Sequence, residues 1–216
     1  EIQYRIKACE IGKQLVANPV DIEVVQFSKG INTNSIEYSP VVSGDESTLI
    51  FTSNRTSNDG ENDLMQSDDL YIVDKVDGEW QQAKKMTNDI NSSSHEACVS
   101  LSFDGNTLFI YKNDNGDGNL YESSMGTDGW QTPQKMDVPI NSKYLETHGC
   151  LSADRGTFYF SSDRPGGFGG LDIYVSRKLP NGKWSKPQNL GPQINTAKDE
   201  DSPFIHADNS QLYFSS

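Results

Sequence analysis

The stretch from Ile140 to Phe160 reads INSKYLETHGCLSADRGTFYF. It opens with Ile-Asn, has a glutamate six residues after the isoleucine, and ends in an aromatic run that begins eighteen residues after it. The same features return at the same offsets three more times in this chain of 216 residues. Fixed offsets indicate one structural unit in several copies, so this is a repeat protein. The isoleucines are Ile31, Ile90, Ile140 and Ile194, and the glutamates are Glu37, Glu96, Glu146 and Glu200.

The length of the repeat favours strands over helices. Successive repeats start 59, 50 and 54 residues apart, near residues 31, 90, 140 and 194. Such periods are typical of β-propeller blades and exceed those of most helix-pair repeats. Nearly all of the variation falls between the aromatic run and the next tyrosine. Insertions confined to one connection are expected for a surface loop between packed strands.

Each repeat contains four strand segments. The first follows the glutamate, the second is the aromatic run, the third ends in a tyrosine, and the fourth lies between a tryptophan and the next Ile-Asn. Hairpin signals such as Asp104-Gly105 and Asn181-Gly182 separate them. We therefore predict an all-β fold, a β-propeller of four-stranded antiparallel blades. The second strand is apolar on both faces, so neighbouring blades must cover both.

The start of the chain differs from the rest. Apolar residues near helical spacing predict one short helix over residues 1–17, which ends at Asn18-Pro19. We divide the chain into a helix and linker over 1–20 and a partial propeller over 21–216. About three and a half blades are present, a closed ring needs at least about four, and we expect six in the full protein. The segment from Val24 to Phe27 is predicted to be the last strand of a final blade beyond Ser216.

Composition limits the partners. The net charge is −13, with 31 acidic and 18 basic residues, so nucleic acid and anionic membrane surfaces are poor partners. No run approaches the roughly 20 apolar residues of a membrane-spanning helix, and no signal peptide is evident. Cys98 and Cys150 lie at different offsets in neighbouring repeats. This stagger predicts buried thiols rather than a disulfide.

Four segments carry a family resemblance. Ser161 to Tyr174, Gly182-Lys183-Trp184, Asn189-Leu190-Gly191-Pro192 and Asp199 to Ile205 resemble the PD40 propeller repeat, which is WD40-like and related to the TolB propeller. The similarity extends over residues 19–216. It departs from the family pattern in the second repeat, where a phenylalanine replaces the usual proline and a polar loop replaces the glycine-rich one.

The resemblance implies a particular domain arrangement. Proteins of this type in Bacteroidota have a TPR-like helical domain before the propeller and often an OmpA-like, peptidoglycan-binding domain after it. One such protein is an accessory lipoprotein of the type IX secretion machinery. The segment from Glu1 to Val20 matches the junction between helical domain and propeller. The peptidoglycan-binding residues of the family have no counterpart in this sequence, so none is assigned.

The four repeated glutamates are the first candidate site. Their equivalent positions predict that they converge near the rim of the central channel, where clustered carboxylates could bind a cation or a basic peptide. The alternative is that each carboxylate accepts hydrogen bonds from the backbone of the adjacent blade and holds the ring together. The residues concerned are Glu37, Glu96, Glu146 and Glu200.

Other motifs favour ordinary structural roles. Asn113, Asn115, Asp117 and Gly118 match the start of a calcium loop, but the twelfth position is Ser124 rather than glutamate, which favours a polar turn. The glycine-rich loop of the third repeat lacks the lysine and helix of a phosphate site. The three histidines lie at different offsets, so we expect no metal site and no cofactor. They are His95, His148 and His206.

Catalysis has little support in the sequence. Cys98 and His148 share one offset in adjacent repeats and are the nearest approach to a nucleophile and a base. No oxyanion hole or third orienting group accompanies them, so we predict that the protein is not an enzyme. The recurring tryptophans are predicted to be packing residues, with glycan stacking as the alternative. They are Trp80, Trp130 and Trp184.

The function predicted from these observations is binding or scaffolding without catalysis. With the resemblance, it implies a periplasmic protein associated with the outer membrane, a lipoprotein in full-length form, that holds envelope proteins or cell-wall material. Two alternatives stay open. One is a glycan-binding propeller. The other is a hydrolase with a site in the central channel, which would need Asp, Glu or His residues from several blades with perturbed protonation.

Overall fold

The computed structural model describes most of the chain. Asn115 of the calcium-loop match, and Glu1 and Val20 of the predicted junction, lie outside the described residues. The described ranges are 2–19, 21–28, 30–55, 68–87, 89–92, 95–114 and 116–216.

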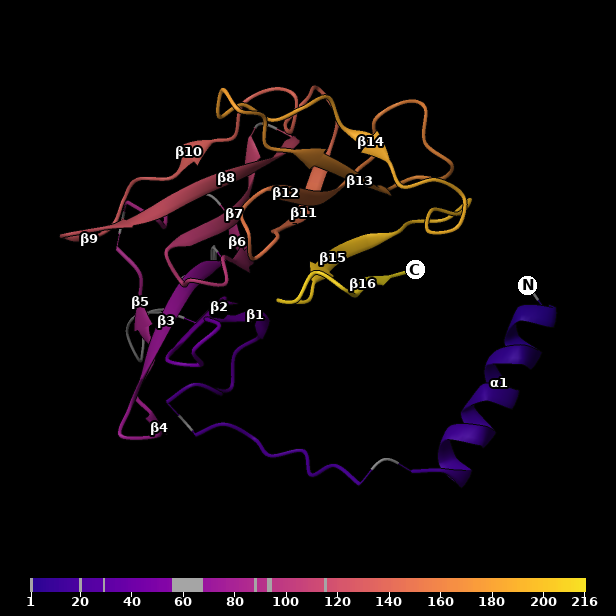
Figure 1. Ribbon diagram of the computed structural model, residues 1–216. Helices are drawn as coiled ribbons and strands as arrows, with labels where there is room; N and C mark the ends of the chain where they lie inside the picture. Colours follow the sequence, from indigo (N-terminus) through magenta and orange to yellow (C-terminus); the bar gives the residue numbers. More distant parts are fainter. Residues whose placement is uncertain are drawn as a thin grey trace.

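The chain begins with the predicted helix, α1 (Ile2–Ala17). The helix ends where Asn18 donates from its backbone N and its side-chain Nδ2 to the Gln14 carbonyl, at 3.1 and 3.0 Å. It stands apart from the strands in Figure 1, and its apolar residues are exposed. Within the described ranges, no helix has the length and apolarity needed to cross a membrane. The TPR-like domain of which α1 would be a part stays a prediction.

The described residues after α1 form three antiparallel four-stranded blades and one hairpin, as predicted (Figure 1). In each blade the first strand pairs with the second, the second with the third, and the third with a fourth of only two residues. Blade 1 contains β1 (Glu37–Val42), β2 (Thr48–Ser53), β3 (Asp69–Val76) and β5 (Lys84–Lys85). Blade 2 contains β6 (Glu96–Leu101), β7 (Thr107–Asp114), β8 (Asp117–Gly126) and β10 (Gln134–Lys135). Blade 3 contains β11 (Glu146–Leu151), β12 (Thr157–Ser162), β13 (Asp172–Arg177) and β14 (Gln188–Asn189), and the hairpin contains β15 (Asp201–Ile205) and β16 (Leu212–Ser215).

Two short strands were not anticipated. In blades 1 and 2 the third strand continues past the fourth and folds back at a tight turn, so that β4 (Glu79–Trp80) pairs with β3 and β9 (Gly129–Trp130) pairs with β8. The first strand of each blade faces the common centre, since β1 contacts β6, β6 contacts β11, and β11 contacts β15. Each first strand also contains a bulge in its pairing with the second. Bulges increase the local bend and twist of a strand.

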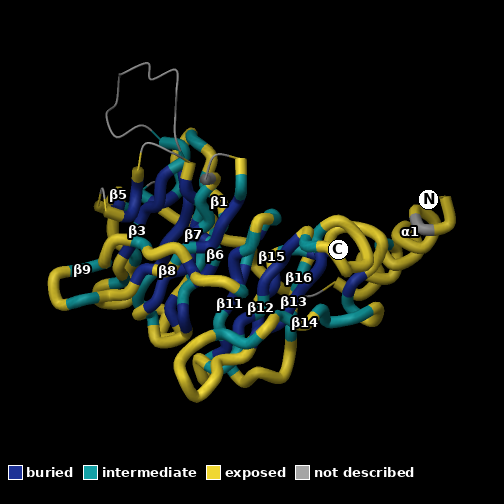
Figure 2. The backbone as a smooth tube through the Cα atoms, turned by 90° about the horizontal axis from the view of Figure 1, so that it is seen from above, coloured by how far each residue is buried: buried dark blue, intermediate teal, exposed yellow. Residues whose placement is uncertain are grey.

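The core lies between the blades, which confirms that both faces of the second strand are covered. Ile50 of blade 1 packs against Leu108 of blade 2 in one buried cluster, and Phe109 of blade 2 packs against Phe158 of blade 3 in another. Figure 2 shows the buried residues concentrated along these strands. Full burial of such a side chain contributes about 1.5 to 3 kcal/mol, so the stacked faces stabilise the arc of blades.

The segment from Val24 to Phe27, predicted to be a detached strand, makes only some of the expected contacts. No strand is assigned over 21–28, because no described strand lies beside this segment to share backbone hydrogen bonds, and Val24 is 91% exposed. Phe27 nevertheless packs edge-on against Trp80, with ring centroids 6.2 Å apart, and Ile31 is buried against the same face of blade 1. These two residues lie against blade 1 as Met86 and Ile90 of the next repeat lie against blade 2.

Candidate functional site

The glutamate that begins each first strand is held inside its own repeat. Glu146 is fully buried. Its Oε2 accepts a hydrogen bond from the backbone N of Ser142 at 2.9 Å, and its Oε1 accepts from Ser142 Oγ at 2.7 Å and from Ser162 Oγ at 2.8 Å. Arg164 Nη2 donates to the same Oε1 at 2.9 Å. Both carboxylate oxygens are therefore occupied by groups of the third repeat.

The same hydrogen-bonding arrangement recurs in the other repeats. Glu96 and Glu200 are buried and accept hydrogen bonds from the backbone N of Ser92 and Thr196, while Glu37 accepts from Thr33 Oγ1 at 2.6 Å. The donors are residues of the same repeat, so the idea that each carboxylate bonds to the backbone of the adjacent blade is wrong. None of the four glutamates lines either of the cavities described below. A binding role for them stays a prediction, and their burial favours a structural one.

The adjacent blades are instead joined by the asparagine of Ile-Asn, which sequence reasoning missed. Asn141 Oδ1 accepts from the backbone N of Leu120 at 2.9 Å, and its Nδ2 donates to the carbonyls of Leu120 and Met136, each at 2.8 Å. The side-chain amide thus takes the place of a strand residue at the edge of β8. Asn91 and Asn195 do the same for the blades before them. The invariant spacing of this asparagine was the available signal.

The arginine that follows the second strand also has a structural role. The Arg164 guanidinium lies over the rings of Phe160 and Tyr174, with centroid distances of 4.8 and 5.2 Å, and pairs with Glu146. Arg55 makes the equivalent contacts in blade 1. Cation–π contacts combined with a buried carboxylate hold the end of the second strand against the third. These repeated charges are thus used in building the blades.

The glycine-rich loop brings neighbouring repeats close together. A Cβ on Gly169 would lie 1.9 Å from the carbonyl oxygen of Lys198, and one on Gly167 would lie 1.7 Å from Asp172 Oδ2. Glycine is required at Gly169 because the obstacle there is the backbone of the next repeat, whereas at Gly167 it is a side chain of the same repeat. The next repeat fills the space beside the loop. This supports the interpretation of the glycines as a sharp bend rather than a phosphate site.

The calcium-loop match is a tight hairpin turn in the structure. Asn113 pairs with Gly118 in the ladder of β7 and β8, and Gly116 donates its backbone N–H to Asn113 Oδ1 at 2.8 Å. The polar turn predicted as the alternative is therefore what the described residues form. Within those residues, no group of three or more His, Cys, Asp and Glu side chains could hold a metal ion.

Each histidine pairs with an aspartate through Nδ1 rather than joining the other two. His148 of β11 contacts Asp201 of β15 at 3.0 Å, and the corresponding distances are 3.0 Å for His95 and 2.8 Å for His206. Burial raises the pKa of Asp201, but the hydrogen bond and attraction from His148 together with hydrogen bonds from Thr147 and the Ser202 backbone outweigh it, and the pKa falls to about 2. The nearest nucleophile and base in the sequence are not brought together, because His148 contacts this aspartate instead of Cys98.

The two cysteines of blades 2 and 3 are buried free thiols, as predicted. Burial raises the pKa of Cys98, which is fully enclosed between blades 1 and 2. Burial likewise raises the pKa of Cys150 to about 12. Because the thiolate is the nucleophilic form, neither sulfur is suited to covalent catalysis at neutral pH.

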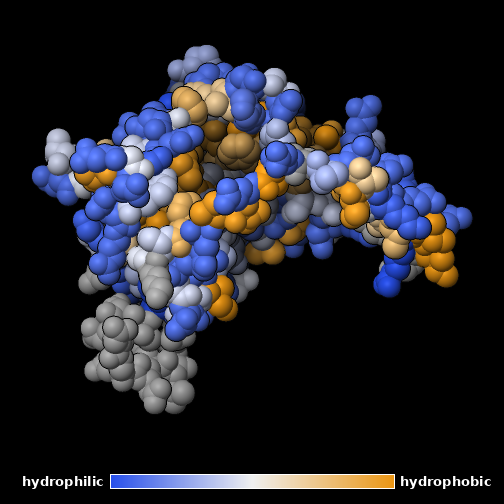
Figure 3. All heavy atoms as spheres, turned by 90° about the horizontal axis from the view of Figure 1, so that it is seen from below, coloured by the Kyte–Doolittle hydropathy of each residue, from blue (hydrophilic) through white to orange (hydrophobic). Residues whose placement is uncertain are grey.

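The inner strands of the blades surround a cavity of 520 Å³ at the centre of the arc. Figure 3 shows hydrophobic residues in the hollow at the centre of the molecule. No Asp, Glu, Lys or Arg among the described residues lines this cavity, although 23% of the chain is charged. Phe103, the residue that replaces the usual proline, is 53% exposed here with its ring against Gly44. Its lining includes Val42, Phe103, His148 and Phe204.

Comparison with known proteins supports the fold. No protein-family model matches the chain, and no curated protein does. Among solved structures, TolB from Acinetobacter baumannii matches 88% of this chain and 39% of its own, with a TM-score of 0.53 and 20% identity. A TolB structure from Agrobacterium tumefaciens matches 85% of this chain and 58% of its own, with a TM-score of 0.52 and 16% identity.

A gluconolactonase from Xanthomonas campestris matches nearly as well, covering 88% of this chain and 57% of its own, with a TM-score of 0.51 and 18% identity. The chain thus spans about two-fifths to three-fifths of the length of these structures. At such identities the likeness establishes the fold. After α1 the chain is therefore all-β and has the fold of β-propeller blades, like those of the TolB structures.

Proposed function

We propose that this chain is a non-catalytic binding or scaffolding propeller that holds protein partners at its central cavity. One observation carries the proposal. The repeated Glu, Asn and Arg side chains are bonded within and between the blades, whereas apolar side chains such as Phe103 remain exposed at an uncharged cavity. Exposed apolar surface enclosed by polar residues is typical of sites that bind other proteins.

We place this function in the periplasm of a cell envelope, in association with the outer membrane. The resemblance of Ser161 to Tyr174 to PD40 repeats supports this location, and the TolB-like fold agrees with it. A net charge of −13 favours basic or neutral partners through long-range attraction. A TPR-like domain, an OmpA-like peptidoglycan-binding domain, a lipid anchor and a part in type IX secretion belong to the same proposal.

The test is partner capture from an envelope extract by the full-length protein and by two variants. Phe103→Ser removes apolar surface from the cavity, and Phe168→Ser is the matched control, since Phe168 is similarly exposed but lies in the loop of blade 3. We expect the wild type and the control to retain the same envelope proteins and Phe103→Ser to retain several-fold less. Equal capture by all three, or capture of cytosolic proteins alone, contradicts the proposal.

A hydrolase with a central-channel site is a second candidate, favoured by one observation. His148 lines the cavity and hydrogen-bonds through Nδ1 to Asp201 of the next blade, which leaves Nε2 of the imidazole for a water molecule. If this candidate is right, the protein hydrolyses a small ester such as p-nitrophenyl acetate and His148→Asn abolishes the activity. Equal rates of hydrolysis by the wild type and by His148→Asn would contradict the hydrolase candidate.

A further inference from the structure

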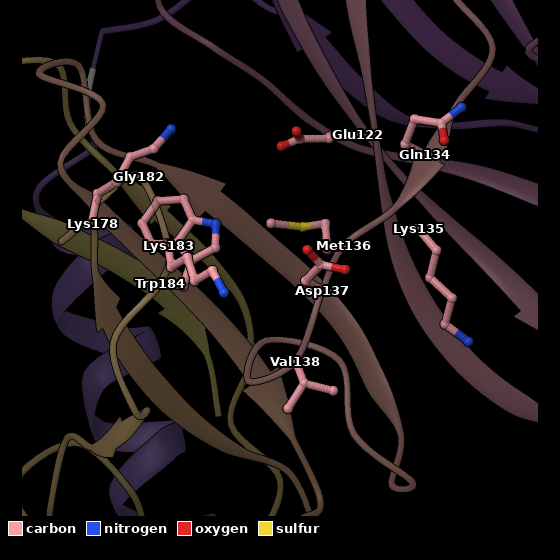
Figure 4. Close-up of a pocket in the computed structure, with 10 residues that line it drawn as sticks. All are labelled: Glu122, Gln134, Lys135, Met136, Asp137, Val138, Lys178, Gly182, Lys183 and Trp184. Atoms are coloured by element: carbon pink, nitrogen blue, oxygen red, sulfur yellow. The ribbon is translucent and has the colours of Figure 1, made fainter. Parts of the chain in front are cut away.

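A second cavity, of 660 Å³, lies between the outer strands of blades 2 and 3. Its walls are β8 and β10 on one side and the segment around β13 and β14 on the other (Figure 4). Both walls belong to complete four-stranded blades whose contact is filled by the cluster around Phe109 and Phe158. The shape of this outer groove is therefore set by the packing of two finished blades, and its volume is in the range of sites that bind small molecules.

The outer groove combines an apolar floor with charged walls. Met136 is buried at its base, and Figure 4 shows Glu122 and Met136 pointing from blade 2 toward Trp184 of blade 3. Asp137, Lys178 and Lys183 are the other charged side chains that line this gap. Lys135, by contrast, points away from the gap in the same view.

The repeat does not require these charges. The corresponding boundary between blades 1 and 2 is built from the same strands and also contains a methionine and a tryptophan, Met86 and Trp130. Four charged residues of the outer groove have uncharged counterparts there. Glu122, Asp137, Lys178 and Lys183 correspond to Ile72, Thr87, Met125 and Gly129. The fold therefore forms without these charges between blades 1 and 2. The charges of the outer groove, between blades 2 and 3, are free to serve a ligand.

The polar groups of the outer groove are available for a ligand. Within the part of the chain that the structure describes, Glu122, Asp137 and the ammonium of Lys183 form no ion pair, and Trp184 Nε1 makes no hydrogen bond. The groove thus offers two carboxylate acceptors beside an ammonium donor and an indole donor. A hydroxyl group can both donate and accept, so a ligand with several hydroxyls satisfies this mixture whichever group each one meets.

We propose that the outer groove binds a neutral sugar unit of a glycan. Met136 supplies an apolar floor for the sugar ring, and the indole of Trp184, which has Lys178 Nζ over its ring at 5.4 Å, supplies an N–H donor at its edge. Glu122, Asp137 and Lys183 pair with the hydroxyls of the sugar. The two carboxylates of Glu122 and Asp137 are balanced by the two ammonium groups of Lys178 and Lys183, which favours a ligand without net charge. This site lies apart from the central cavity and goes beyond the partner binding proposed above.

The test uses the tryptophan indole signals in ¹H–¹⁵N spectra of the full chain. Trp80, Trp130 and Trp184 each contribute one signal, so the first two serve as internal controls. Cellotriose, maltotriose and N,N′,N″-triacetylchitotriose are each added at up to about 50 mM, above the millimolar Kd of a shallow groove. We expect at least one of these neutral trisaccharides to move the Trp184 signal saturably and to leave the other two signals in place.

Two variants test the specific contacts. Glu122→Gln is expected to weaken binding at least three-fold, whereas Glu79→Gln, an exposed glutamate on the outer hairpin of blade 1, is expected to leave the affinity unchanged. The proposal is overturned if no trisaccharide moves the Trp184 signal, if all three indole signals move together, or if the tripeptide Lys-Ala-Lys binds in preference to every sugar. Because these residues are absent from the central cavity, failure here leaves the partner-capture result unaffected.

Discussion

Replacing Asn141 by alanine should destabilise the protein more than any exposed asparagine replacement. The change removes three hydrogen bonds that join the third repeat to blade 2. The Leu120 carbonyl keeps the bond from the backbone N of Met136 at 3.0 Å, but the backbone N of Leu120 and the carbonyl of Met136 lose their side-chain partner. Each buried group left unsatisfied costs about 1 to 3 kcal/mol, so the expected loss is about 2 to 6 kcal/mol.

The assay is urea unfolding followed by tryptophan fluorescence, since Trp130 and Trp184 pack against the two blade interfaces. Asn106→Ala is the matched control, because that asparagine is exposed and its side chain makes no hydrogen bond to any described residue. It should change the free energy of unfolding by less than about 0.5 kcal/mol. The reasoning is refuted if the Asn141→Ala protein unfolds at the same urea concentration as the control.

Further predictions follow from the ionisable groups. Although burial raises the pKa of Asp201, interactions with His148, Thr147 and the Ser202 backbone together lower it to about 2. Its stabilisation is therefore complete above about pH 4 and is lost as the pH falls through 2. Wild type and Asp201→Asn should therefore approach each other in free energy of unfolding by about 2 kcal/mol between pH 5 and pH 2, and a pH-independent difference would contradict this. In a thiol titration of the native protein at pH 8, exposed Cys9 should react with a disulfide reagent while Cys98 and Cys150 do not until urea is added; rapid reaction of all three would show that the blade interfaces open.

The architecture was predictable because propeller blades are built from local contacts. Each hairpin joins segments adjacent in the chain, and a turn such as Asp104-Gly105 marks its position. The apolar runs around Ile50, Phe109 and Tyr159 identify the second strands directly. The segment from Val24 to Phe27 was less predictable, since a strand is defined by the hydrogen bonds of a neighbour. No described strand supplies them.

The site was harder to predict because burial decides what a polar side chain can do. Glu146 has the spacing of a residue that recurs for function, yet its oxygens are taken by Ser142 and Arg164 in its own repeat. In the sequence, the spacing of Asn141 only marks the repeat. It does not indicate that this side chain makes the bonds between blades. Both residues are equally regular in sequence, so regularity could not separate them.

Periodicity along the chain was sufficient to predict blades, their strands and their order, because the alternation of apolar residues and turns is a local property. Two other features are not local properties of the chain. These are the pairing of His148 with Asp201 and the position of Glu122 and Trp184 in the same outer groove. These residues lie in different blades, more than 50 residues apart in the chain. Their proximity depends on how far each blade is rotated against the next, an angle set by the packing of large buried side chains between the sheets and therefore decided only in the folded arc.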